Sequence, residues 1–91
     1  MIYEYVKTND QLTGVLLAKE IDGTVWVSWS ACNTKKDIFN KGFGIQLAET
    51  RLITGSKKEL PYRFEGQYTR FIERCKRYFR TSNIRTIDER S

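Results

Sequence analysis

Alternating apolar and polar positions dominate the first third of the chain and predict β-strands. Residues 2–7 place tyrosine and valine at positions that suit one strand. Residues 13–20 read as a second strand, in which Gly14 suits a bulge, and residues 24–30 form the clearest third strand. Between the last two, Asp22-Gly23 is typical of a tight hairpin turn. We therefore predict a three-stranded antiparallel meander.

The third predicted strand has two different faces. Val25, Val27 and Trp29 are expected to face the core, because the opposite face combines Trp26 with two serines. Trp26 is then either covered by the rest of the chain or left as a stacking surface. The large area that a tryptophan buries favours cover.

Apolar residues at helical spacing begin after the strands. The first predicted helix covers residues 35–51, with Thr34 as its N-cap and Asp37 completing a pair that resembles a capping box. Glycines at positions 42 and 44 indicate a break or a close backbone contact. The apolar face of this helix is expected to consist of Ile38, Phe39, Phe43, Leu47 and Ala48.

The second predicted helix follows Pro61 and carries one long apolar stripe. The stripe consists of Phe64, Tyr68, Phe71, Ile72, Cys75, Tyr78 and Phe79. Such a stripe has to be buried, and the sheet is the available partner. The prediction is an α+β fold of order β-β-β-α-α with both helices packed on the sheet, a single domain over residues 1–80 and a flexible C-terminal tail over 81–91.

Composition narrows the class of protein. The chain has 91 residues, and its 40% of hydrophobic residues is too high for a disordered chain. No run approaches the ~18 apolar residues of a membrane helix, and the N-terminus lacks the plan of a signal peptide. We therefore expect a cytoplasmic protein with no membrane partner.

Catalytic and metal-binding residue types are scarce. The chain has no histidine, and its two cysteines, Cys32 and Cys75, are isolated, so they are expected to be free thiols. We predict no metal site, no cofactor and no catalytic residue, and hence a protein that is not an enzyme. Cys32, ahead of a helix N-terminus, is the one weak catalytic alternative, and a structural role suits it better.

Positive charge is concentrated near the C-terminus. Residues 1–60 carry 8 basic and 7 acidic side chains (+1), whereas residues 61–91 carry 8 and 4 (+4). In the second helix, Arg70, Arg74 and Arg77 recur at i, i+4 and i+7 and so share one side. Their spacing of ~5–6 Å per turn is close to the phosphate repeat of a nucleic-acid strand, and guanidinium groups grip phosphate well.

A nucleic-acid surface is therefore predicted on this helix, with lysines of the first helix extending it. A solvated face that keeps the protein soluble, or a surface for an acidic protein, would have the same charge. No helix-turn-helix, zinc-finger or RNA-recognition signature is present, so sequence-specific reading of DNA is not supported. The predicted binding residues are Arg63, Arg70, Arg74, Lys76, Arg77, Arg80, Lys35, Lys36 and Lys41.

Residues 29–52 resemble a block found in small accessory proteins of tailed bacteriophages. In those proteins a strand that ends in an aromatic residue and serine leads into Cys-Asn, then a Lys-Asp-x-Phe-x-Lys-x-x-Gly helix and an Ala-x-x-Arg-Leu end. The resemblance implies a phage setting and a counter-defence role; one similar type is the small basic RNA-binding antitoxin of the TifA kind, which neutralises a ribonuclease toxin. The matching residues are Trp29, Ser30, Cys32, Asn33, Lys36, Asp37, Phe39, Lys41, Gly44, Ala48, Arg51 and Leu52.

Together these observations predict a non-catalytic phage accessory protein. It would bind RNA or single-stranded nucleic acid through its basic C-terminal helix and inhibit a host defence nuclease or toxin. The alternative is a protein-interaction module that docks on a host defence protein without nucleic acid. An open edge of the predicted sheet would also allow a homodimer.

Overall fold

The protein folds into a four-stranded sheet and two α-helices. The computed structural model describes residues 1–32, 40–56 and 58–89. Strands β1, β2 and β3 form the predicted antiparallel meander, and a fourth strand, β4, pairs parallel to β3. The α+β class is confirmed. In chain order the elements are β1 (Ile2–Thr8), β2 (Gln11–Ile21), β3 (Thr24–Ala31), α1 (Lys41–Thr54), the 3₁₀ turn η1 (Tyr62–Phe64), α2 (Glu65–Phe79), β4 (Ile84–Thr86) and the 3₁₀ turn η2 (Ile87–Glu89).

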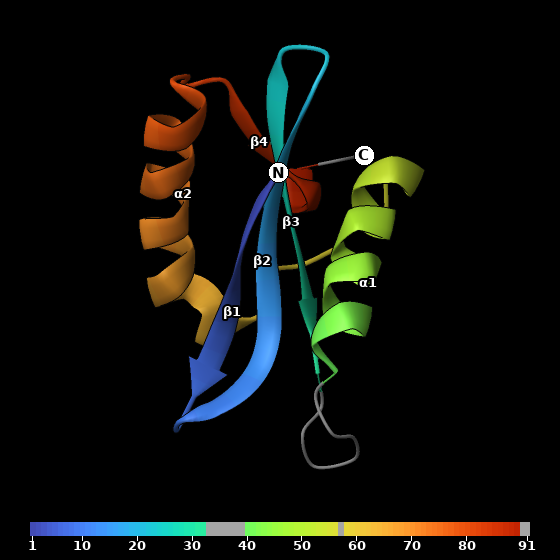
Figure 1. Ribbon diagram of the computed structural model, residues 1–91, viewed down its shortest axis with the longest axis vertical. Coiled ribbons are helices and arrows are strands. Elements are labelled where there is room, and N and C mark those ends of the chain that lie inside the picture. Colours follow the sequence, from blue (N-terminus) through green and yellow to red (C-terminus); the bar gives the residue numbers. More distant parts are fainter. Residues whose placement is uncertain (33–39, 57, 90–91) are drawn as a thin grey trace.

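The two helices cover opposite faces of the sheet (Figure 1). Trp29 of β3 faces α2, where its ring lies edge-on to Tyr68, whereas Ser30 faces α1 and donates to the carbonyl of Gly44. A strand buried on both faces reads as a continuous apolar run, not an alternating one. This explains why every residue from 13 to 18 of β2 is buried. The supposed polar face of β3 is covered too, and Trp26 is partly buried against the core.

Two-residue turns join the three antiparallel strands. Asn9 and Asp10 have φ of 52° and 64°, and Asp22 and Gly23 have φ of 51° and 81°. Positive φ at both central positions is the pattern of the hairpin turns whose twist matches that of the strands. The predicted Asp-Gly hairpin is confirmed. The irregularity expected at Gly14 is also present, since the β1–β2 register shifts just beyond its partner Val6.

Helix α1 packs through small residues. Its N-cap is Asn40, whose side chain accepts from the Phe43 amide at 2.9 Å; the predicted N-cap and capping pair at 34 and 37, and apolar positions 38 and 39, lie outside the described residues. The predicted apolar face is wrong at Phe43, which is 62% exposed. Small residues suit a close approach to the sheet, as shown by the 2.7 Å bond from Ser30 Oγ to the Gly44 carbonyl. The residues that α1 buries are Gly44, Ala48 and Leu52.

The predicted flexible tail is wrong for residues 84–89. Strand β4 lies beside β3, the Val25 amide donates to the Asn83 carbonyl at 3.0 Å, and Ile87 is fully buried. Without β4, strand β3 would expose its backbone polar groups along an open edge. The segment after α2 therefore completes the sheet, and the domain extends at least to Glu89.

Candidate nucleic-acid interface

Helix α2 rests on the sheet through the predicted apolar stripe. Phe71 and Cys75 are fully buried, as is Phe64 at the end of η1. Gln67 adds a hydrogen bond between α2 and the sheet, because its Nε2 donates to the Tyr5 carbonyl of β1 at 2.9 Å. The prediction that the stripe is buried is wrong only at Tyr78, whose side chain is exposed. The other side of α2 is left to solvent.

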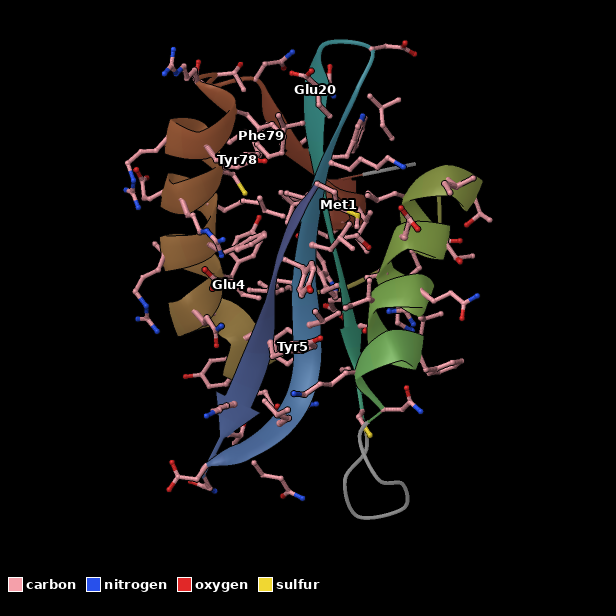
Figure 2. The ribbon with its side chains drawn as sticks, in the orientation of Figure 1. Met1, Glu4, Tyr5, Glu20, Tyr78 and Phe79 are labelled. Atoms are coloured by element: carbon pink, nitrogen blue, oxygen red, sulfur yellow. The ribbon has the colours of Figure 1, made fainter. Side chains whose placement is uncertain are left out.

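Three arginines of α2, with Arg63 of η1 just before the helix, form what we call the arginine strip: Arg63, Arg70, Arg74 and Arg77. The seven residues from Arg70 to Arg77 complete almost two turns, so these two side chains share one side of α2, and Arg63 lies ahead of them in the chain. All three are exposed. Nitrogen-ended side chains project from α2 away from the sheet (Figure 2). Within the described part of the chain, no ion pair involves Arg70 or Arg77.

Arg74 is tied to the neighbouring strand. Its Nη1 donates to Glu4 Oε1 of β1 at 2.8 Å, and the same carboxylate accepts from Gln67 at 3.3 Å. Glu4 points from β1 toward α2 (Figure 2). Both side chains are only partly exposed, so Arg74 fixes α2 against β1 with its charge partly compensated. It is the member of the strip least available to a phosphate.

The remaining predicted residues of this region differ in their surroundings. Lys76 pairs with Glu73 at 3.3 Å on the exposed surface, where such a pair contributes little to stability. Arg80 is exposed and caps α2 in the left-handed conformation, with φ of 53°. Arg63 lies 5.2 Å from the centre of the Phe64 ring and donates to the Cys32 carbonyl at 3.4 Å. Arg63 is thereby held at the N-terminal end of the strip.

Lys41 lies on the other side of the sheet. It begins α1, and its Nζ is 5.2 Å from the centre of the Tyr5 ring. Tyr5 extends from the face of β1 opposite Glu4 (Figure 2). The structure therefore does not bring Lys41 into the arginine strip, while Lys35 and Lys36 lie outside the described residues.

Comparisons of the chain with protein families, curated proteins and solved structures find no match. The arrangement of the side chains is therefore what bears on function. No group of three or more potential metal ligands occurs in the described ranges. Nor is any helix in those ranges both long and apolar enough to cross a membrane.

The two cysteines differ in their surroundings. Cys75 is on the buried side of α2, where burial raises the pKa of its thiol to about 11; the nearby Arg74 guanidinium opposes this rise. Cys32 is partly exposed at the end of β3. Neither cysteine is in a disulfide, and because the thiolate is the reactive form, Cys75 is protected both by its pKa and by the surrounding side chains.

We expect a disulfide reagent at pH 8 to modify Cys32 quickly and Cys75 only when the protein unfolds. At that pH the Cys75 thiol, with its pKa of about 11, is almost entirely protonated. The release of the reagent's chromophore with time measures this directly. Replacing Cys32 with serine should remove the fast phase, and a fast phase that survives this change would contradict the buried position of Cys75.

Proposed function

We propose that this protein binds single-stranded nucleic acid, RNA or DNA, through the arginine strip of α2. The observation that carries the proposal is a row of guanidinium groups on the solvent side of a helix whose other side is fixed to the sheet. Arg70 and Arg77 are its two exposed members within α2, and neither forms an ion pair in the described part of the chain. Neutralising phosphates releases condensed counterions, which favours binding without regard to base sequence.

The two acidic residues of α2 form no ion pair with the strip among the described residues. Glu73 is four residues before Arg77, but it pairs with Lys76, and Glu65 lies at the first turn, near the positive end of the helix dipole. The carboxylate that reaches the strip comes from β1 and is engaged by Arg74. The remaining positive charge favours a polyanion.

The phage setting is part of the same proposal and rests on the resemblance of residues 29–52. Some of the matching residues tie α1 to β3: Ser30 bonds to Gly44, and Arg51 Nη1 donates to the Trp29 carbonyl at 2.7 Å. Partial burial there lowers the pKa of Arg51. These contacts serve the fold, whereas a counter-defence role would act through α2, by occluding or sequestering a host nuclease or toxin.

Reversing the charge of Arg70 and Arg77 is expected to weaken binding by about 100-fold or more, since each arginine–phosphate contact contributes ~1.5–3 kcal/mol. The measurement is a titration of a labelled single strand, followed by fluorescence anisotropy. The salt dependence should also become shallower, with a slope reduced by about 1.4 for two lost contacts on a single strand. Arg74 is left unchanged, because its replacement would also break the bond to Glu4.

The matched control is the double variant Lys41→Glu and Arg85→Glu. Both side chains are exposed, and both belong to the α1 side of the sheet, where Arg85 pairs in register with Trp26. The control changes the net charge by the same amount, so it separates a local contact from general attraction. Equal loss in the two double variants would contradict a site on α2. No binding by the unaltered protein would instead favour an acidic protein as partner.

A further inference from the structure

Two exposed tyrosines stand at the ends of the arginine strip. Tyr62 is 86% exposed in η1, directly before Arg63, and Tyr78 is 59% exposed, directly after Arg77. Six large apolar or aromatic side chains are exposed among the described residues, and these two lie next to the strip in the chain. Exposed aromatic rings beside a basic surface are typical of proteins that bind single strands.

Tyr78 borders the strip on the side of Arg74. It follows Arg74 by four residues, one helical turn, and is about 80–100° around the helix from Arg70 and Arg77. Its ring meets that of Phe79 edge-on at 4.8 Å between centroids, which restrains it without covering it. Tyr78 and Phe79 lie together near the C-terminal end of α2 (Figure 2).

The two rings are far enough apart to act on different bases. Tyr62 precedes α2, and the thirteen steps from Glu65 to Tyr78 within the helix correspond to about 20 Å along its axis at ~1.5 Å per residue. A strand that follows the arginines from one ring to the other is a few nucleotides long, at the lower end of the ~4–16 nucleotides that single-strand-binding surfaces cover. The arginines in between are spaced to meet its phosphates.

We propose that Tyr62 and Tyr78 stack on bases at the two ends of a short single strand whose phosphates contact the arginine strip. This inference rests on the proposed function and adds selectivity to it. In the interior of a duplex both faces of each base are already stacked, so the tyrosines gain nothing there. In a single strand, stacking adds to the phosphate contacts, and the protein prefers single strands of RNA or DNA over duplexes.

The test compares four ligands of about eight nucleotides: a single strand of RNA, a single strand of DNA, the DNA duplex and an abasic DNA strand. Tyr62→Ala and Tyr78→Ala are each expected to weaken binding of the single strands by about 5- to 100-fold. They should leave binding of the abasic strand and the duplex unchanged. Phe43→Ala is the matched control, because Phe43 is also exposed but belongs to α1.

Tyr78→Leu is the control for a loss of structure in Tyr78→Ala, since leucine keeps an apolar contact with Phe79 but has no ring to stack. It should therefore weaken single-strand binding as alanine does. Equal losses on abasic and normal strands, or no loss on either, would overturn the stacking proposal while leaving the arginine site intact. Duplex binding as tight as single-strand binding would also overturn it. Absence of nucleic-acid binding by the unaltered protein, or unchanged binding after Arg70 and Arg77 are reversed, would instead defeat the proposed function itself.

Discussion

Replacing Ile87 with alanine is expected to lower the free energy of unfolding by about 2–5 kcal/mol, through lost burial and the cavity left behind. Ile87 belongs to η2, directly after β4, and none of its surface is exposed. It is part of the same core cluster as Val25 and Val27 of β3. For a domain of this length, whose whole stability is ~5–14 kcal/mol, such a loss is a large fraction.

Urea denaturation followed by tryptophan fluorescence measures the effect, and Ile53→Ala is its matched control. Ile53 lies in α1 and is 70% exposed, so the same chemical change there should alter stability by less than ~0.5 kcal/mol. Similar small changes at the two positions would mean that the segment after α2 frays in solution. A selective loss at Ile87 would show that β4 and η2 belong to the cooperative unit.

Local signals were enough to predict much of the sheet. The Asp22-Gly23 pair defines its turn through positive φ at both positions, which is a property of the two residues themselves. The meander then follows from strands of suitable length on either side. The stripe of α2 was equally readable, because large apolar residues at steps of three and four indicate one buried side.

The side of α1 that packs on the sheet could not be read from hydrophobicity. A large residue at Phe43 looks like core, yet the buried positions are occupied by Gly44, Ala48 and Leu52. The size of the side chains determines which side of α1 packs on the sheet. Small side chains let the helix lie close enough for the Ser30 hydroxyl to donate to the Gly44 carbonyl. The serines of β3 misled the prediction for the same reason, since a second helix covers their face.

Long-range partners were also beyond the sequence. Strand β4 has three residues, too few for a periodic pattern, and its place beside β3 depends on a parallel pairing across about sixty residues. In the candidate site, too, local spacing was readable from the sequence and long-range partners were not. Helical spacing predicts that Arg70, Arg74 and Arg77 share one side of α2, but nothing near Arg74 in the chain indicates that Glu4, at the other end of the sequence, pairs with its guanidinium.

Replacing Gly14 with alanine is expected to cost about 3 kcal/mol or more, since overpacking costs ~1–3 kcal/mol even where neighbours adjust. A Cβ at this position would lie 2.3 Å from Phe64 Cζ and 2.5 Å from the Ser30 carbonyl oxygen. Phe64 is fully buried, and Ser30 is held in the β2–β3 ladder, so neither side can move away freely. The backbone of Gly14 has no positive φ, and the cost is therefore one of packing alone.

Gly66→Ala is the matched control and should change stability in the opposite direction. Gly66 lies in the first turn of α2, is exposed, and a Cβ there would meet nothing within 4 Å. Alanine should stabilise the helix by up to ~1 kcal/mol, because glycine loses more backbone freedom on folding. Equal stability of the two variants in urea would mean that Phe64 does not press against β2. Opposite signs would establish the contact that seats the N-terminal end of α2, and with it the arginine strip, on the sheet.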